Sequence, residues 1–183
     1  MNVYDFDKTL YRGDSTLDFY RFCLTRQPGL VRRVPGQCLR MFGAVVGRAG
    51  RTALKQGFYS FLPAVRELDG ALSAFWEQAA SGMNQSLVEG LREGDLVISA
   101  SPAFLLAPVC EQLGVALLAS EVDPRTGACL GANCRGEEKV RRLREAYPDA
   151  VIDCFYSDSR TDAPLAALAN RAYFVQEGHV EPW

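Results

Sequence analysis

Short apolar runs separated by helical stretches fill the second half of the chain, and this alternation constrains its fold most strongly. The predicted strands are residues 95–99, 115–119, 151–156 and 172–176, and the predicted helices are residues 103–113, 137–146 and 162–169. Such runs between helices are typical of a parallel sheet with both faces covered. We therefore predict a doubly wound, Rossmann-like α/β core whose ligand site lies at the carboxyl ends of the strands.

Residues 15–92 carry no strand-like alternation. Their periodicity predicts helices at residues 15–26, 30–48, 51–62, 68–81 and 84–92. Prolines and glycines separate these stretches, as is usual between helices. We expect residues 15–92 to form an all-helical cap inserted into an α/β core of residues 1–14 and 93–183. Ser15 is the expected N-cap of the first helix.

Two aspartates follow the short apolar run at the N-terminus. In Asp5-Phe-Asp7-Lys-Thr9 the polar residues alternate, and a strand alternates its faces, so these three side chains are expected on one side of a strand end. Two like charges about 4 Å apart repel by roughly 4 kcal/mol at a surface-like dielectric. A divalent cation with oxygen ligands is the usual compensator, and chemistry on phosphate is its usual purpose.

Three later segments place polar residues where they could meet these aspartates. Ser99 ends a predicted strand, and Lys139 stands in a Gly-x-x-Lys context at the start of a predicted helix. Asp158 and Asp162 follow another predicted strand. Because the carboxyl ends of parallel strands meet at one edge of the sheet, Asp5, Ser99 and Asp158 are expected to lie close together.

Together these segments resemble the four sequence motifs of the haloacid dehalogenase superfamily of phosphohydrolases, and look closest to its phosphoserine-phosphatase-like branch. The matching residues are Asp5-Phe-Asp7-Lys-Thr9, Ser99, Lys139 and Asp158-Ser-Arg-Thr-Asp162, within residues 1 to about 176. Tyr11-Arg-Gly-Asp-Ser15 and Asn133-Cys-Arg-Gly-Glu-Glu-Lys139 also resemble that branch. The resemblance implies a helical cap over the active site and an enzyme that hydrolyses a small phosphomonoester.

The resemblance implies separate tasks for the two N-terminal aspartates. Asp5 would be the nucleophile, which attacks phosphorus and forms an aspartyl-phosphate. Asp7 would be the general acid for the leaving alkoxide and then the general base for the water that cleaves the intermediate. Dehalogenating relatives lack this second acid, so Asp7 favours chemistry on phosphate over chemistry on a carbon–halogen bond.

The remaining motif residues are expected to bind the phosphoryl group. Thr9, Ser99 and backbone N–H groups near Ala100 would hydrogen-bond it or hold the loop that carries the nucleophile. Lys139 would pair with Asp5 and with phosphoryl oxygens. The alternative for Lys139 is an ordinary lysine on the surface of a helix.

A magnesium ion is the expected cofactor. The implied ligands are the Asp5 carboxylate, the Asp7 backbone carbonyl and Asp158, with waters completing an octahedron. Asp162 would orient a metal-bound water or Lys139. The alternative for Asp158 and Asp162, taken alone, is capping of a helix N-terminus.

Charge is distributed unevenly along the chain. Residues 19–66 contain no Asp or Glu and carry +9, so the remainder carries −11 within a formal net charge of −2. The basic residues are Arg21, Arg26, Arg32, Arg33, Arg40, Arg48, Arg51, Lys55 and Arg66. A basic cap beside an acidic metal site would attract anionic substrates, although basic residues can also simply solubilise helices.

Two interpretations of Asp14 bear on the substrate. In phosphoserine phosphatases an acid shortly after the first motif binds the substrate amine, and Asp14 stands at a comparable place, but it can equally cap the helix near Ser15. The basic cap favours a more anionic or bulkier phosphorylated metabolite. Two alternatives remain, a phosphotransferase that uses another alcohol instead of water, and a non-catalytic module that binds anionic lipid or nucleic acid through residues 19–66.

Composition indicates the setting of the protein. A chain of 183 residues with 48% apolar content can bury one core and a small accessory unit. Six cysteines without a Cys-x-x-Cys pair, and no signal-like N-terminus, predict reduced thiols, no zinc site and a cytoplasmic location. The longest apolar stretch, residues 41–47, is far below the about 20 residues that span a bilayer. Little interleaving of aromatic and basic residues argues against a nucleic-acid partner.

Overall fold

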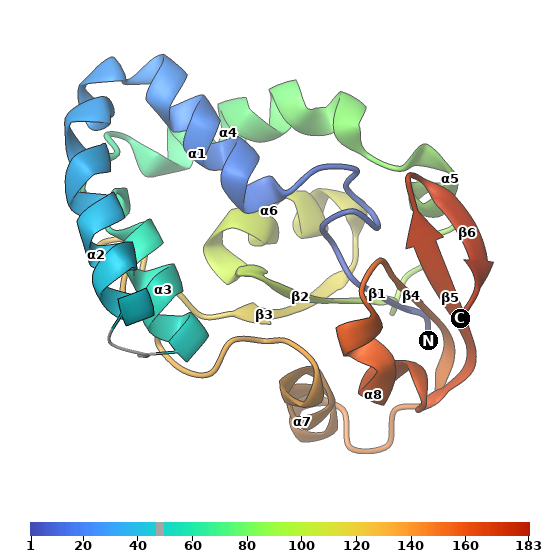
Figure 1. Ribbon diagram of the computed structural model, residues 1–183. Helices are drawn as coiled ribbons and strands as arrows, with labels where there is room; N and C mark the ends of the chain where they lie inside the picture. Colours follow the sequence, from blue (N-terminus) through green and yellow to red (C-terminus); the bar gives the residue numbers. More distant parts are fainter. Residues whose placement is uncertain (47–49) are drawn as a thin grey trace.

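The computed structural model describes residues 1–46 and 50–183, apart from the side chains of residues 50–52 (Figure 1). The strands are β1 Val3–Tyr4, β2 Leu96–Pro102, β3 Ala116–Ser120, β4 Ile152–Ser157, β5 Ala169–Gln176 and β6 His179–Pro182. The α-helices are α1 Ser15–Arg26, α2 Val34–Val46, α3 Gly50–Tyr59, α4 Leu68–Ala79, α5 Gln85–Val88, α6 Ala103–Leu113, α7 Glu137–Ala146 and α8 Ala163–Ala166. Short 3-10 helices are η1 Pro28–Arg33, η2 Leu62–Ala64, η3 Ala80–Gly82 and η4 Arg160–Asp162.

Six strands form one sheet in the order β3-β2-β1-β4-β5-β6. The pairs from β3 through β5 are parallel, and β6 runs antiparallel to β5. In the middle of the sheet, Val3 of β1 pairs with Leu96 of β2 and Phe155 of β4. The predicted doubly wound α/β core is therefore confirmed, and Asp5 lies directly after a central strand.

Both faces of the sheet are apolar and covered by helices. Val3 and Leu96 are buried in a cluster with residues of α7 and α8, whereas Tyr4 and Val97 are buried in a cluster with residues of α6 and the N-terminal helices. Figure 1 shows α6 on one side of the sheet and α7 and α8 on the other. Successive strand residues point to opposite faces, and both faces must be apolar here, which explains why these strands appear as continuous apolar runs.

The helices α1 to α5 occupy the stretch between β1 and β2, and lie on the α6 side of the sheet (Figure 1). Trp76 of α4 anchors them, because its indole N–H donates to the carbonyl of Leu105 in α6 at 2.7 Å. The Trp76 ring also packs edge-on against Phe6, with 5.6 Å between ring centroids. One apolar cluster thus runs from these helices into the α/β core.

Two local predictions are wrong, and one strand is not predicted. Asp14, not Ser15, caps α1, and its carboxylate accepts the N–H of Leu17 at 3.0 Å. The helix predicted at residues 162–169 is shortened to η4 and α8, because β5 begins at Ala169. Strand β6 has no predicted counterpart, because its residues are exposed and leave no apolar pattern. It is joined to β5 by Glu177 and Gly178, which both have positive φ, as a tight hairpin turn requires.

Four cysteines, Cys23, Cys110, Cys134 and Cys154, are free thiols in the buried core. Within residues 1–46 and 50–183, no helix has the length and apolar character needed to cross a membrane.

Candidate active site

Asp5 begins the site at the end of β1. Its backbone N–H donates to the carbonyl of Tyr156 at 2.8 Å, which extends the pairing of β1 with β4 by one residue. Its carboxylate accepts the N–H of Phe6 at 2.9 Å and lies 2.9 Å from Nζ of Lys139. Asp5 is therefore a buried carboxylate with a positive partner, aimed away from the strand that carries it.

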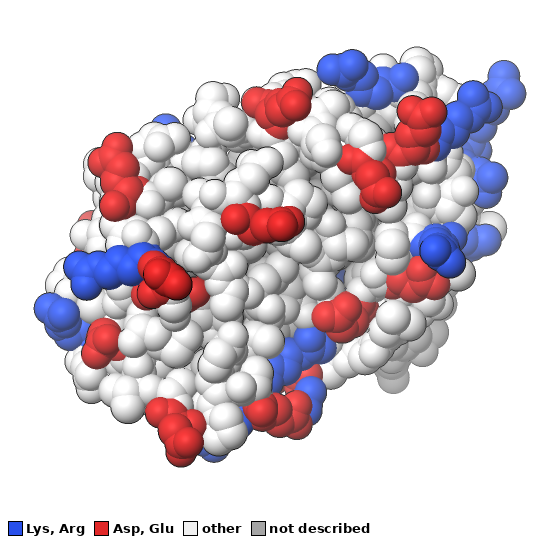
Figure 2. Space-filling model, turned by 180° about the vertical axis from the view of Figure 1, so that it is seen from behind, with Lys and Arg blue, Asp and Glu red and all other residues white. Residues whose placement is uncertain are grey.

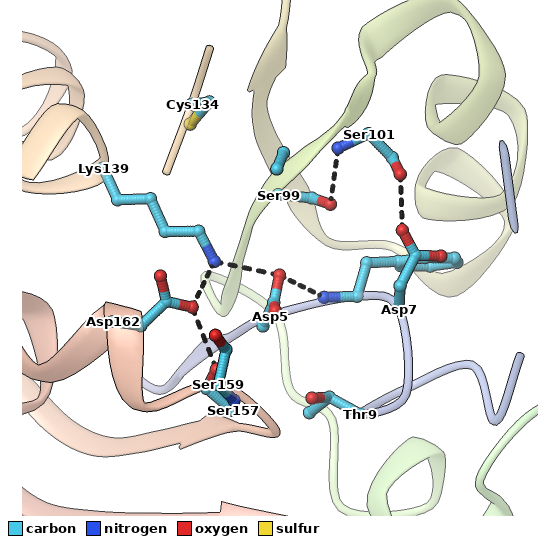
Figure 3. A network of polar contacts seen from close by, with 12 residues as sticks. Asp5, Asp7, Thr9, Ser99, Ser101, Cys134, Lys139, Ser157, Ser159 and Asp162 are labelled. Carbon is cyan, nitrogen blue, oxygen red and sulfur yellow. Dashed lines mark hydrogen bonds and ion pairs between the residues drawn. The ribbon is translucent and has the colours of Figure 1, made fainter. Parts of the chain in front are cut away.

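The chain turns directly after Asp5, so the expectation that Asp5, Asp7 and Thr9 share one strand face is wrong. Lys8 adopts positive φ, and the carbonyl of Phe6 accepts the N–H groups of both Thr9 and Tyr11. Figure 3 shows the consequence, with Asp5 directed toward Lys139 and Asp7 toward Ser101. Asp5 and Asp7 therefore reach the cavity from a turn, not from one strand face, and Thr9 contacts the backbone of Asp158 instead.

Asp7 occupies a different environment from Asp5. One carboxylate oxygen accepts the N–H of Ser15, the first residue of α1, at 2.7 Å, and the other accepts the hydroxyl of Ser101. Burial nevertheless raises the pKa of Asp7 to about 6, although these hydrogen bonds favour the charged form. Asp7 can therefore hold a proton near neutral pH.

Lys139 lies at the bottom of the site. It is 1% exposed, and its Nζ is 2.9 Å from Asp5 and 2.7 Å from Asp162. Burial disfavours the ammonium, but the two carboxylates outweigh burial and raise the pKa of Lys139. The alternative of an ordinary surface lysine is therefore excluded.

Gly136 explains the Gly-x-x-Lys spacing. It has positive φ directly before α7, and a Cβ atom there would lie 3.3 Å from the carbonyl oxygen of Thr161. A glycine thus allows the start of α7 to approach the segment after β4 closely. The first turn of α7 then directs Lys139 toward Asp162.

Asp162 is held by several donors. Its carboxylate accepts Nζ of Lys139, the hydroxyl of Ser157 at 2.9 Å and the N–H of Gly136 at 3.4 Å. The helix that follows it has no side-chain cap, so the capping alternative is wrong for Asp162. Asp162 orients Lys139, and through it the carboxylate of Asp5.

Asp158 lies half-buried near Asp5. Its backbone N–H donates to the Thr9 hydroxyl at 3.1 Å, and no side-chain cap precedes η4. Burial raises the pKa of Asp158 to about 6, and the charge of Asp5 adds to this increase. Thr9 therefore holds the segment that carries Asp158. Thr9 itself is not among the described residues that line the cavity.

Ser99 and Ala100 occupy the end of β2. The Ser99 hydroxyl is buried and accepts the N–H of Ser101 at 3.1 Å, and the carbonyl of Ala100 accepts Nζ of Lys55 at 2.8 Å. The contact between Ser101 and Asp7 is not among the expectations drawn from the sequence. The strand was expected to end at Ser99, but β2 continues to Pro102, which brings Ser101 to Asp7.

A cavity of about 470 Å³ joins these residues. It is lined by the predicted residues Asp5, Asp7, Asp14, Ser99, Ala100, Lys139, Asp158 and Asp162. Asp14 reaches it while capping α1, so the structure places it in both positions that were considered.

The helices between β1 and β2 form the opposite wall of the cavity. Apolar side chains dominate this wall, namely Leu17, Met41, Leu54 and Phe58. Lys55 is the basic residue among the described residues of this wall. None of the described arginines in residues 19–66 lines the cavity. Arg48 and the side chain of Arg51 lie outside the described residues. Lys55 donates to the side-chain oxygen of Asn133 at 2.6 Å and to the carbonyl of Ala100.

Two of the carboxylates have oxygens available to a divalent cation. Both oxygens of Asp7 and both of Asp162 accept hydrogen bonds, whereas Oδ2 of Asp5 and the Asp158 carboxylate accept none from the described residues. No group of three or more His, Cys, Asp or Glu side chains suited to a metal occurs among the described residues. An ion would therefore need backbone and water oxygens as well. The repulsion between Asp5 and Asp158 is what such a cation would relieve.

The sequence model of haloacid dehalogenase-like hydrolases matches residues 3–167. Protein CicA of Caulobacter vibrioides strain NA1000 is 28% identical over 195 residues, which cover 96% of this chain and 86% of CicA.

Among solved structures, a Bordetella pertussis Tohama I protein of unknown function has a TM-score of 0.74 at 23% identity, with 94% of this chain and 87% of that chain covered. A probable phosphoserine phosphatase from Vibrio cholerae has a TM-score of 0.63 at 16% identity, covering 93% of this chain and 54% of that longer chain. At these identities the structural likeness shows the shared fold.

Proposed function

We propose that this chain, which belongs to the haloacid dehalogenase-like hydrolase family, is a phosphatase that cleaves small phosphomonoesters through an aspartyl-phosphate. The observation that carries the proposal is the unequal setting of two carboxylates that line one cavity. Burial raises the pKa of both carboxyls, but Asp5 is paired with the cation of a buried lysine, whereas Asp7 accepts hydrogen bonds from the neutral donors Ser15 and Ser101. Neighbouring acids in such different environments suit a nucleophile and a proton donor.

The reaction would proceed in two steps. The Asp5 carboxylate attacks phosphorus, the bond to the ester oxygen breaks, and Asp7 delivers its proton to that oxygen. Asp7 then takes a proton from a water whose oxygen attacks the aspartyl-phosphate, which releases inorganic phosphate and restores Asp5. Lys139 holds the Asp5 carboxylate in position and presents positive charge to the phosphoryl oxygens.

The cofactor in this proposal is Mg²⁺, held by the carboxylates of Asp5 and Asp158 and the backbone carbonyl of Asp7. All three donors are oxygens, and Mg²⁺ commonly uses one or two carboxylates together with several waters. When bound, the ion would neutralise charge on the phosphoryl group. Asp162 would act indirectly, by orienting Lys139.

The substrate in this proposal combines a phosphate with a compact apolar portion. The cavity of about 470 Å³ has a mostly apolar wall opposite the aspartates, formed by residues such as Met41, Leu54 and Phe58. Lys55 supplies one cation on that wall, with two neutral acceptors already bound. A second polar or anionic group on a small metabolite could contact it.

The first experiment measures release of inorganic phosphate from an aryl phosphate by the full chain with Mg²⁺. Asp5→Asn is expected to lower turnover by at least about 10³-fold, because the nucleophile is lost. Asp7→Asn is expected to lower it by about 10²- to 10⁴-fold, because proton transfer is lost. Asp149→Asn, which alters an exposed acid outside the cavity, is the control. Full activity of Asp5→Asn contradicts the proposal.

Metal and substrate are tested separately. EDTA is expected to stop turnover and added Mg²⁺ to restore it, and turnover that survives chelation would refute the proposed metal site. A panel of phosphorylated metabolites is then assayed with Lys55→Gln and with the control Gln56→Ala, which alters the exposed neighbour. For substrates with a second acceptor group, KM is expected to rise about tenfold in Lys55→Gln alone.

A further inference from the structure

The outward face of α2 is apolar and exposed. We define the outer face of α2 as Leu39, Phe42, Val45 and Val46, whose exposed fractions are 71%, 65%, 62% and 65%. Their spacing of three and four residues places them along one side of a helix. An exposed apolar surface of this kind marks a site that contacts a membrane or another protein.

Buried polar contacts set the orientation of this helix. Gln37, on the inward side of α2, is 4% exposed; its side chain accepts the hydroxyl of Tyr20 at 2.7 Å and donates to the carbonyl of Phe58 at 2.7 Å. Gly57 of α3 lets the two helices approach, since a Cβ atom there would lie 3.2 Å from the backbone nitrogen of Met41. The exposure of the outer face therefore follows from how α2 is fixed to α1 and α3.

Positive charge accompanies the apolar residues. Arg32 and Arg33 directly precede α2 and Arg40 lies within it, and all three are exposed. Residues 19–66 contain no acid that could neutralise them. Figure 2 shows Lys and Arg side chains along the edge of the molecule where α2 lies in Figure 1, with Asp and Glu side chains among them. The surface thus combines exposed apolar side chains with exposed arginines.

From this combination we infer that the outer face of α2 docks on membranes that contain anionic lipids. An amphipathic helix with bulky apolar residues and arginines lies in the interface of a bilayer, where the former enter the acyl region and the latter contact anionic headgroups. A second copy of the chain fits less well, because a symmetric contact would bring arginines against arginines. Nucleic acid would satisfy the arginines but leave the apolar residues in water.

Docking in this way would bring the cavity close to the lipid surface. Met41 of α2 lines the cavity, as do Leu54 and Phe58 of α3. The two helices would then separate the bilayer from the candidate active site. This inference concerns an interaction surface and does not depend on the proposed phosphatase activity.

Vesicle flotation with the full chain tests the inference. The probes are phosphatidylcholine vesicles, alone or with about 30 mol% phosphatidylglycerol. Wild type is expected to float with the anionic vesicles and much less with the neutral ones. Val46→Glu is expected to lower the bound fraction at least about tenfold, because the charge would have to enter the acyl region. Val151→Glu is the matched control, since Val151 is also 65% exposed but lies before β4.

The outcomes are distinct. Loss of flotation in Val46→Glu and Phe42→Glu, with wild-type flotation of Val151→Glu, supports docking on lipid. Equal flotation of all variants, or none by wild type, overturns it. A dimer in lipid-free solution that Val46→Glu dissociates would assign the surface to a second copy, and salt-sensitive DNA binding without flotation would assign it to nucleic acid.

Turnover of the soluble aryl phosphate separates this result from the proposed function. The Val46→Glu and Phe42→Glu side chains do not line the cavity, so their turnover is expected to match wild type. Asp5→Asn, which should be inactive, is expected to float like wild type.

Discussion

The Ser101 hydroxyl donates a hydrogen bond to the Asp7 carboxylate across 94 residues of sequence. The Thr16 hydroxyl lies 3.0 Å from the same oxygen of Ser101, so α1 and β2 both hold the candidate general acid. Without Ser101, Asp7 would keep its hydrogen bonds with Ser15. Ser101 is thus a positioning residue that acts through Asp7.

Ser101→Ala should lower kcat for an aryl phosphate by about 10- to 150-fold and leave KM nearly unchanged, because a hydrogen bond to a charged group is worth about 1.5–3 kcal/mol. Ser101→Thr, which keeps the hydroxyl, should recover part of the rate. Ser81→Ala, at an exposed serine far along the chain from both elements, serves as the control in steady-state kinetics. An equal loss of kcat in Ser101→Ala and Ser81→Ala would exclude the positioning role.

Lys139→Met should destabilise the fold by about 3–5 kcal/mol, since it leaves the buried carboxylates of Asp5 and Asp162 without their cation. The measurement is the free energy of unfolding in urea at neutral pH. In the triple variant Asp5→Asn, Lys139→Met, Asp162→Asn no buried charge of this group remains, so most of the lost stability should return. A triple variant as unstable as Lys139→Met would show that packing of the lysine stem, not charge balance, is what matters.

Gly127→Ala should be much more destabilising than Gly94→Ala. Both glycines have positive φ, which costs about 1 kcal/mol for alanine. A Cβ atom at Gly127 would also overlap the carbonyl of Tyr59 at the end of α3, whereas nothing lies within 4 Å at Gly94. The difference between the two free energies of unfolding therefore measures this contact alone, and we expect it to exceed about 2 kcal/mol. Similar losses in the two variants would show that α3 can move away.

Glu138→Gln should destabilise the protein at neutral pH but not in strong acid. Hydrogen bonds from Arg141 and then Arg142 lower the pKa of Glu138 from 4.5 to about 2. A carboxylate with a lowered folded-state pKa contributes stability above its unfolded pKa, and this contribution is lost as the pH falls from about 4.5 to about 2.

At pH 7 we expect a loss of about 1 kcal/mol in Glu138→Gln, since the contact is at the protein surface. Urea unfolding at a series of pH values should show the difference from wild type shrinking below pH 4.5. Glu111→Gln, at an exposed glutamate of α6, is the control and should show no such convergence. A difference that stays constant with pH would mean that the ion pairs of Glu138 do not carry it.

Elements with strong local signals were predicted closely. The helix predicted at residues 103–113 is α6 with the same bounds, and that at 137–146 is α7. Both helices combine apolar periodicity with clear start and stop signals, so tertiary contacts did not shift their bounds. Strand β6 lacks such a signal because it is exposed, and its existence depends on pairing with β5.

The sequence by itself determined the α/β core, the helices between its first two strands, and the side chains that carry chemistry, because periodicity and residue type are local properties. Only the tertiary structure decided how those side chains are used. The turn at Lys8 separates Asp5 from Asp7, and β2 brings Ser101 to Asp7. The packing of α2 through Gln37 leaves its apolar outer face in solvent. These relationships join residues far apart in sequence, and their energies depend on burial that no local pattern reports.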